Sequence, residues 1–206
     1  MDAIVAIARA HDLLIIEDCA HAIESTYRGT PAGTMGDFGC FSFYATKNLC
    51  TGEGGMIITE SESRAARIKT LALHGMTKDA WKRFSDSGYR HYQVVEAGFK
   101  YNMMDLQAAI GLHQLKRPEQ NWFRRAAVWS QYQEAFGDVP MILPTEPDAG
   151  SRHAHHLYTV RVDEATSGRS RDAFLEAMTA RGIGVGVHYV SLPEQPFYQQ
   201  RFGRLT

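Results

Sequence analysis

The chain has 206 residues, of which 44% are hydrophobic and 22% are charged, a composition typical of a soluble globular protein with one large or two small domains. Its formal net charge of −1, from 22 basic and 23 acidic residues, gives no electrostatic signature for nucleic acid or for an anionic membrane surface. No apolar run approaches the roughly 20 residues that span a bilayer, and the N-terminal segment lacks the basic region of a signal peptide. Three widely spaced cysteines (Cys19, Cys40 and Cys50) without a C-x-x-C pair favour a reducing compartment, the cytosol, and neither a disulfide framework nor a zinc site.

The first 145 residues show the pattern of an α/β unit. Helical spacing predicts a helix over 2–10, and the apolar run 13–18 after it predicts a buried parallel strand that ends in two acids. Further strands are predicted at 38–43 and 54–61, and further helices at 62–75, 104–115 and 119–137. Pro118 interrupts the helical pattern between the last two helices. The stretch 77–98 is polar and aromatic without a clear period, which is typical of a long functional loop.

A different order of elements follows a linker-like segment at 144–154. The sequence predicts a strand at 155–163, a helix at 170–182 with Ser170 as its N-cap and Gly182 as its stop, and a strand at 183–190. No element is expected after this last strand. We therefore predict two domains, residues 1–145 and 146–206, the second a small α+β unit.

Three residues form the main chemical pattern: Asp18 at the end of a predicted strand, Ser42 in another strand, and Lys47 just beyond it. The carboxyl ends of strands in open α/β sheets line the ligand crevice, so all three can face one site. An acid at the end of an apolar strand is costly unless a cationic or hydrogen-bonding group meets it, and a protonated pyridine nitrogen is one such partner. A partly desolvated lysine is an amine nucleophile or a base, and a serine beside a glycine-rich turn can bind phosphate. Pyridoxal phosphate has the three matching groups.

Each of these residues also has an ordinary structural interpretation when it is taken alone. Asp18 then reads as a helix cap or turn residue, Ser42 as an unremarkable strand serine, and Lys47 as a surface lysine. Only the ordered set favours the cofactor site.

Other features of the sequence predict structural roles. The histidines of HAHH at 153–156 lack a carboxylate or cysteine at ligand spacing, so no metal site is expected, although they can line a substrate pocket. Lysine, arginine and tryptophan in the long loop can meet a nucleotide diphosphate, but a solvated loop is the favoured interpretation for Trp81, Lys82 and Arg83. The aromatic set Trp122, Phe123 and Trp129 predicts packing, inside the chain or at a dimer surface.

Three segments of the sequence resemble the DegT/DnrJ/EryC1/StrS family of sugar aminotransferases, which are fold-type-I pyridoxal phosphate enzymes. They are EDCAHA at 17–22, FGCFSFYATKNLCTGEGG at 38–55 and GFKYNMMDLQAAIGLHQL at 98–115. The similarity covers nearly the whole chain. The segments 74–81, 155–174 and 182–189 look closest to the UDP-4-amino-4-deoxy-arabinose aminotransferase branch. The resemblance implies the C-terminal half of a fold-type-I large domain followed by a small α+β domain.

The resemblance also implies a role for each matching residue. Lys47 would hold the cofactor covalently and move the proton between the cofactor C4′ and the substrate carbon, and Asp18 would pair with the pyridinium nitrogen. His21 would lie near the phenolate oxygen of the ring, and Ser42 would bind the phosphate. Lys100, where many members have asparagine, would reach the phosphate of the partner subunit, with Asn102 as a second candidate. His188 and Tyr44 are the candidate substrate-binding residues; for His188, packing within a strand is an equally good interpretation.

The implied function is transamination of a nucleotide-linked keto sugar, expected to be a UDP-4-keto sugar, with glutamate as amino donor, in the synthesis of a cell-surface polysaccharide. The implied assembly is a homodimer with shared active sites. Relatives with histidine at the lysine position act as dehydratases, so Lys47 favours transamination. Compared with the family, the chain is expected to be a fragment that lacks an N-terminal α/β block and the closing strand and helix. The alternatives are a truncated non-catalytic remnant, or a regulator or sugar dehydratase that keeps the cofactor.

Overall fold

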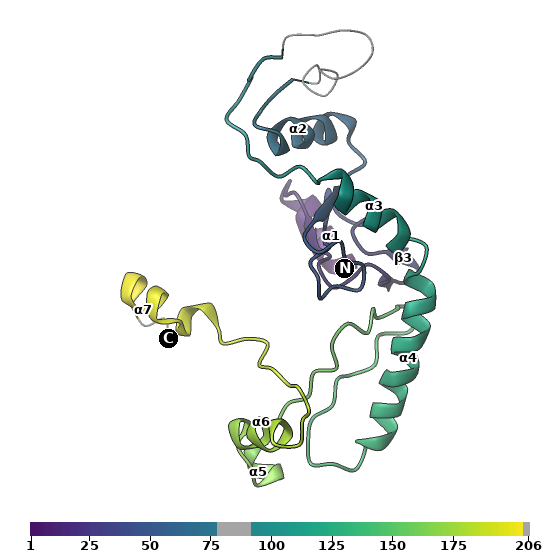
Figure 1. Cartoon of the computed structure of the whole chain (residues 1–206), viewed down its shortest axis with the longest axis vertical. Coiled ribbons are helices and arrows are strands. Elements are labelled where there is room, and N and C mark those ends of the chain that lie inside the picture. Colours follow the sequence, from purple (N-terminus) through teal and green to yellow (C-terminus); the bar gives the residue numbers. More distant parts are fainter. Residues whose placement is uncertain (78–91, 204–206) are drawn as a thin grey trace. The chain divides into compact units, whose positions relative to one another are not determined.

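The computed structural model of the chain describes residues 1–77 and 92–203 (Figure 1). It divides into two compact units, which are described separately. Unit 1 comprises Met1–Glu134 and Thr145–Tyr158, and unit 2 comprises Ala135–Pro144 and Thr159–Thr206. The chain thus leaves unit 1, returns to it and leaves it again, and the domain boundary near residue 145 stays a prediction.

Unit 1 contains a three-stranded sheet in the order β1-β4-β5. In this sheet β1 (Ile16–Asp18) runs parallel to β4 (Phe38–Ser42), and β5 (Gly55–Ile58) runs antiparallel to β4. A second, two-stranded ribbon pairs β2 (Thr26–Tyr27) with β3 (Thr30–Pro31). The strands predicted at 38–43 and 54–61 are confirmed.

The strand predicted at 13–18 is only partly correct. It forms over Ile16–Asp18 alone, and Leu13, Leu14 and Ile16 are 59%, 61% and 68% exposed. The expectation of a buried strand was wrong because β1 is an edge strand of the described sheet. Among residues 1–77 and 92–203, β1 pairs with β4 on one side and with no strand on the other, so its apolar side chains lack a neighbouring strand to pack against on that side.

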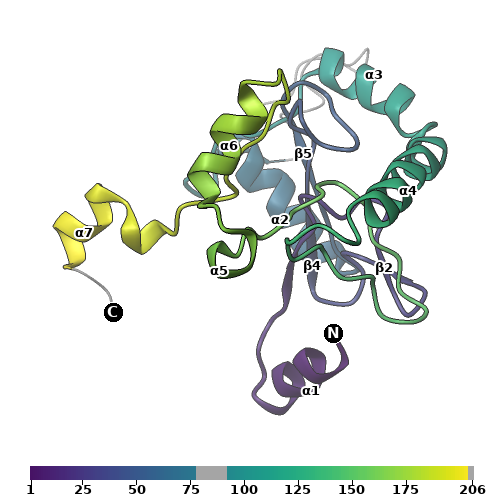
Figure 2. The same cartoon turned by 90° about the horizontal axis from the view of Figure 1, so that it is seen from below.

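The four helices predicted in unit 1 are confirmed. They are α1 (Asp2–Ala10), α2 (Glu62–Ala72), α3 (Asp105–Gln114) and α4 (Pro118–Ala135). The Ser61 hydroxyl caps α2 by accepting from the Arg64 backbone N–H. Pro118 does not merely interrupt a helix but occupies the first position of α4, where its missing N–H costs nothing. Figure 2 shows α3 and α4 following one another along the chain.

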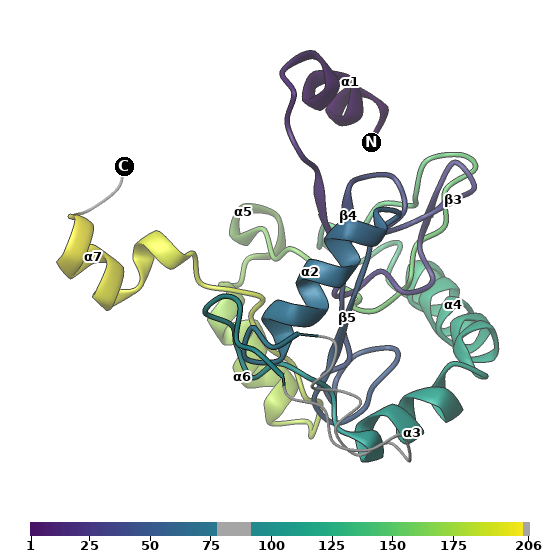
Figure 3. The ribbon, with the colours of Figure 1, turned by 90° about the horizontal axis from the view of Figure 1, so that it is seen from above.

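The start of β4 is tied to α2, which lies over the sheet (Figure 3). Arg64 of α2 forms an ion pair of 2.6 Å with Asp37 and stacks over the ring of Phe38. Asp37 also accepts the Ile15 backbone N–H at 2.9 Å. One carboxylate therefore connects the helix to the entries of both β1 and β4.

The buried residues of unit 1 gather around the loop that joins β4 to β5. Phe43 and Leu49 in this loop are buried, and so are Trp129 of α4 and Ala154 of the returning segment. Ala8 and Cys19 complete the set of buried apolar residues in the part of the chain that the structure describes.

Unit 2 contains short helices: α5 (Glu164–Ser167), α6 (Arg171–Thr179), η2 (Leu192–Glu194) and α7 (Pro196–Phe202). The helix predicted at 170–182 is confirmed, with the Ser170 hydroxyl accepting from the Ala173 N–H as its N-cap. The expectation of no element after residue 190 was wrong, since η2 and α7 follow it. No helix of the described residues has the length and apolar character needed to cross a membrane.

The strands predicted at 155–163 and 183–190 do not form. Arg161 makes a single bridge with Ile142, and 183–190 has no regular structure. A strand is stable only when its backbone groups pair with a neighbour, and a ladder is absent here among the described residues. The β-branched and aromatic composition of these segments was therefore a misleading signal.

Candidate active site

Lys47 lies in the tight loop that leaves the carboxyl end of β4. Its backbone N–H donates to the Tyr44 carbonyl at 2.9 Å, which closes a turn. Two backbone hydrogen bonds of 2.8 Å, from Phe43 to the Gly54 carbonyl and from Thr51 to the Phe43 carbonyl, clamp the base of the loop. The lysine side chain is half-buried. The local fold thus holds Lys47 in a fixed loop, in contrast to a lysine on a solvated helix face.

Asp18 and Ser42 lie at the same edge of the sheet as the Lys47 loop. Asp18 is the last residue of β1 and is in register with Cys40 of the parallel strand β4. Side chains in register point to the same face, and Ser42 lies two residues beyond Cys40, so Asp18 and Ser42 share that face. The spacing along β4 is about 7 Å. The structure therefore brings the predicted acid and hydroxyl together beside the loop of the predicted lysine.

The ordinary structural interpretations of these two residues also have support. Asp18 is exposed, and its Oδ1 accepts the Ala20 N–H at 3.0 Å, as a turn-forming aspartate does. The Ser42 hydroxyl accepts the Tyr44 N–H at 3.4 Å. These bonds orient both side chains at the edge of the sheet and leave the cofactor role of each a prediction.

His21 packs against a second histidine of unit 1. Its ring centroid lies 4.1 Å from that of His156. The Nδ1 atom of His156 lies 2.7 Å from Oδ1 of Asn48, the residue that follows Lys47. The predicted ring-facing histidine and the lysine loop are therefore connected through His156.

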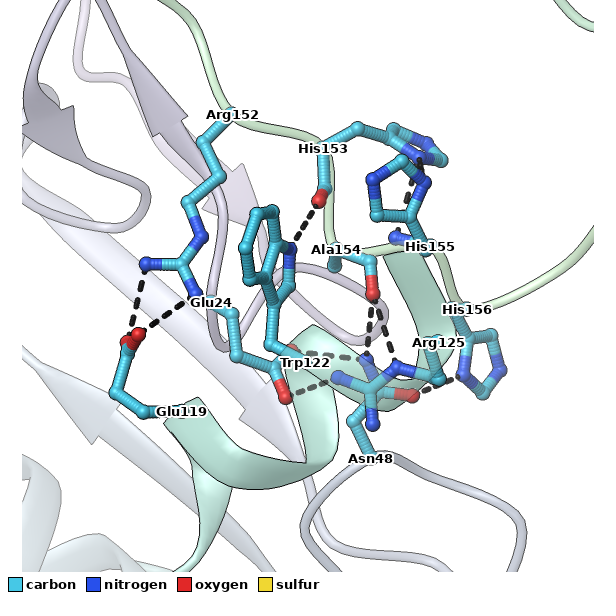
Figure 4. Close-up of polar contacts among 10 residues, drawn as sticks. All are labelled: Glu24, Asn48, Glu119, Trp122, Arg125, Arg152, His153, Ala154, His155 and His156. Atoms are coloured by element: carbon cyan, nitrogen blue, oxygen red, sulfur yellow. Dashed lines mark hydrogen bonds and ion pairs between the residues drawn. The ribbon is translucent and has the colours of Figure 1, made fainter. Parts of the chain in front are cut away.

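The same Asn48 side chain also contacts a buried carboxylate, that of Glu24 (Figure 4). The side chain of Glu24 is 1% exposed and forms an ion pair of 2.5 Å with Arg125 of α4. Glu24 also accepts from the Asn48 amide at 2.8 Å, and the Ala154 carbonyl accepts from both Asn48 and Arg125 at 3.2 Å. Both charges are paired and hydrogen-bonded, as a buried ion pair requires.

Sequence reasoning missed Glu24, Asn48 and Arg125, and it considered His156 only as one of the histidines at 153–156, without its contact to Asn48. Glu24 and Arg125 are separated by 101 positions, and Asn48 and His156 by 108. Nothing in the local pattern around any one of them signals the others. The one available sign was a glutamate between apolar and small residues at 22–26.

The remaining predicted site residues stay predictions. Lys100 is exposed, its amine contacts the Asn102 side chain, and its backbone bridges to Leu73. Tyr44 is 46% exposed beside Ser42, as a ligand-facing residue can be. His188 lies in unit 2 with its ring against Tyr189, and a strand does not surround it.

The histidine-rich segment 153–156 is part of an aromatic cluster. The rings of His153 and His155 contact each other and Trp129 of α4. Burial lowers the pKa of both imidazoles below the ordinary value of 6.5. Groups of three or more possible metal ligands are absent from the described residues. The packing expected of Trp122 and Trp129 is confirmed by these and related ring contacts. Phe123 contacts the Trp122 ring edge-on but is 63% exposed, so for this residue a dimer surface stays a prediction. Trp81, Lys82 and Arg83 lie outside the described residues.

Cys19 lies on the opposite face of the sheet edge from Asp18. Its side chain is buried, and burial together with the nearby Glu17 and Asp18 carboxylates raises the pKa of the thiol to about 11. A thiol with this pKa stays protonated near neutral pH and is a poor nucleophile. Cys19 is therefore a packing residue and does not compete with Lys47 as the reactive group.

The donor set fits pyridoxal phosphate. An amine, a carboxylate, a hydroxyl and an imidazole, from Lys47, Asp18, Ser42 and His21, all come from one edge of one sheet and the loops leaving it. These are the groups that can hold an aldehyde, a pyridinium nitrogen, a phosphate and a phenolate oxygen. The fold and these four groups together are those of an α/β protein that binds pyridoxal phosphate.

Comparison with known proteins agrees with this class. The family model described as "DegT/DnrJ/EryC1/StrS aminotransferase family" matches residues 1–206, and the chain belongs to this family. The chain is 48% identical over 205 residues to the spore coat polysaccharide biosynthesis protein SpsC of Bacillus subtilis, covering 98% of this chain and 52% of SpsC.

Solved structures show the same fold. The putative sugar aminotransferase Spr1654 of Streptococcus pneumoniae, in its PMP-form, matches with a TM-score of 0.81 and 32% identity over 95% of this chain and 49% of that chain. The DesI structure in the presence of its TDP-sugar product matches with a TM-score of 0.80 and 29% identity over 96% of this chain and 48% of that chain. Spr1654 is also known in a PLP-form, and the family is PLP-dependent, so the predicted cofactor and aminotransferase class are confirmed for the family.

The chain spans about half the length of the curated relatives it matches. The family and the mixed α/β fold are shown directly.

Proposed function

We propose that the protein transfers an amino group from glutamate to a nucleotide-linked keto sugar, with pyridoxal phosphate as cofactor, in the synthesis of a polysaccharide sugar. The observation that carries this proposal is the position of Lys47 in a clamped loop at the sheet edge where Asp18 and Ser42 share one face. The family match and the sugar aminotransferases among the solved relatives support it. When bound, pyridoxal phosphate supplies the electron sink that carries the amino group between donor and acceptor.

Each residue of the site has a distinct task in this proposal. The Lys47 amine would hold the cofactor covalently at rest and, once released, would carry a proton to and from the substrate as a base. The Asp18 carboxylate keeps a proton on the pyridine nitrogen, because a nearby negative charge stabilises a cation. The Ser42 hydroxyl and the backbone N–H groups of the adjoining turn bind the phosphate.

The finer features of the proposal are the sugar, the assembly and the compartment. Resemblance of the segments 74–81, 155–174 and 182–189 to one branch favours a UDP-linked 4-keto sugar, and the TDP-sugar product in the DesI structure is a nucleotide sugar of another kind. We also propose a homodimer in which Lys100 reaches the phosphate of the partner subunit. The three free thiols suit the cytosol.

The test is a transamination assay of the full-length protein against a panel of keto-sugar nucleotides. Glutamate should be converted to 2-oxoglutarate only when a keto-sugar nucleotide is present, and Lys47→Ala should abolish the reaction. Lys69→Ala, in helix α2 of the same unit, is the matched control and should retain activity. Loss of water from the sugar without nitrogen transfer would show a dehydratase instead. Cofactor binding without any reaction would favour a regulator.

A further inference from the structure

The buried network behind the Lys47 loop contains a side chain whose orientation is fixed from both ends. The Asn48 amide nitrogen lies 2.8 Å from Glu24 Oε2 and 3.2 Å from the Ala154 carbonyl. A carboxylate and a carbonyl can only accept hydrogen bonds, so the NH2 group of Asn48 must face them. Its carbonyl oxygen then points the other way, toward His156 (Figure 4).

The amide orientation determines the state of His156. Oδ1 of Asn48 is an acceptor, and it lies 2.7 Å from His156 Nδ1, so that nitrogen carries a proton. The ring plane of His156 is fixed by the same hydrogen bond. His21, the histidine predicted to lie beside the cofactor ring, packs against this plane at 4.1 Å.

The two groups that accept hydrogen bonds from the Asn48 amide, the Glu24 carboxylate and the Ala154 carbonyl, are themselves held in place. Ala154 is 1% exposed, and the Glu24 side chain is equally buried. Arg125 fixes both, through an ion pair with Glu24 and a hydrogen bond to the Ala154 carbonyl. Because α4 carries Arg125, the helix sets the position of the Asn48 amide.

We propose that Asn48 is a positioning residue of the cofactor site, which fixes the tautomer and ring plane of His156 and, through it, the ring of His21. The inference rests on the proposed function, since it assigns His21 to the cofactor. Asn48 and His156 act through other residues and are not catalytic residues. The same amide also anchors the loop of Lys47, so one buried carboxylate sets both the reactive lysine and the ring-facing histidine.

The test uses His156→Phe and Asn48→Leu in the full-length protein. His156→Phe keeps a flat ring against His21 but loses the hydrogen bond to Asn48. We expect each variant to raise the dissociation constant for pyridoxal phosphate about tenfold, which corresponds to one lost hydrogen bond. The thermal midpoint of the protein without cofactor should change little in His156→Phe, because an apolar ring is tolerated in this aromatic setting.

The double variant separates positioning from packing. If Asn48 acts through His156, then His156→Phe added to Asn48→Leu should raise the dissociation constant less than about threefold further, since coupled residues are not additive. His153→Phe is the matched control, a histidine three positions before His156 whose ring contacts Trp129 and His155. It should leave cofactor affinity unchanged.

Three results would overturn the inference. They are unchanged cofactor affinity in both single variants, independent effects that multiply in the double variant, or a fall in thermal midpoint without cofactor that matches the loss of affinity. In each case wild-type binding of pyridoxal phosphate would leave the proposed function standing. Failure of the wild-type protein to bind the cofactor at all would overturn both.

Discussion

The buried ion pair between Glu24 and Arg125 gives the sharpest stability prediction. Arg125→Ala leaves the Glu24 carboxylate, whose side chain is 1% exposed, without its cation at 2.5 Å. Within residues 1–77 and 92–203, the neutral Asn48 amide is then the hydrogen-bond partner that remains. An uncompensated buried charge of this kind costs about 3–5 kcal/mol of unfolding free energy.

The chain contains a matched control ion pair with the same nitrogen–oxygen distance and different burial. Arg28 and Asp2 also lie 2.5 Å apart, but their side chains are 64% and 66% exposed. Solvent screening and side-chain entropy reduce such a pair to about 0–1 kcal/mol. Arg28→Ala should therefore cost several-fold less than Arg125→Ala.

The assay is urea unfolding of each variant, followed by circular dichroism and by tryptophan fluorescence. Glu24→Gln combined with Arg125→Met removes both charges and should recover most of the loss, because replacing a whole buried pair is often nearly neutral. A cost for Arg125→Ala no greater than that for Arg28→Ala would refute the reasoning. So would a double variant as unstable as Arg125→Ala alone.

Three further predictions concern separate parts of unit 1. The pKa of the Cys19 thiol is raised from 9.0 to about 11, so the folded state holds this proton more tightly and the stability of the protein should fall as the pH rises from 9 to 11. In Cys19→Ser, urea midpoints should fall less over this pH range. Equal curves for the wild type and the variant would contradict the prediction. The Ile15 N–H and the Arg64 guanidinium lower the pKa of Asp37 below 3.8, so the contribution of this carboxylate to stability is present above pH 3.8 and is lost on further acidification. In Asp37→Asn, the urea midpoint should therefore fall less steeply as the pH is lowered. Gly75→Ala should destabilise the protein far more than Gly29→Ala. Both glycines have positive φ, but a Cβ at Gly75 would overlap the Glu96 carbonyl oxygen, whereas Gly29 faces open space. Similar thermal midpoints of the two variants would contradict this prediction.

Elements with a clear local signal were predictable from the sequence. The periodic helices predicted at 2–10 and 62–75 and the N-cap predicted at Ser170 follow from spacing and side-chain chemistry alone. The strand predicted at 38–43 forms over 38–42, so Ser42, which was expected within the strand, is its last residue. This is why the sequence could order Asp18, Ser42 and Lys47 at one sheet edge.

Features that depend on distant partners were not predictable in this way. The segments 155–163 and 183–190 have strand-like composition, but a strand exists only where a neighbour offers hydrogen bonds. The Glu24–Arg125 pair is equally non-local, because the two residues meet only after α4 has packed beside the Lys47 loop. Composition reports a preference, while pairing and packing decide whether it is realised.

The most direct test of the account is to locate the cofactor on the chain. The full-length protein is incubated with pyridoxal phosphate, reduced with borohydride to make the lysine–cofactor bond permanent, digested and analysed by mass spectrometry. The account predicts a single modified peptide, with the added mass on Lys47, and no such peptide in Lys47→Ala. Modification of Lys69, Lys100 or Lys116 in place of Lys47, or no specific modification, would contradict the assignment of this lysine as the cofactor anchor.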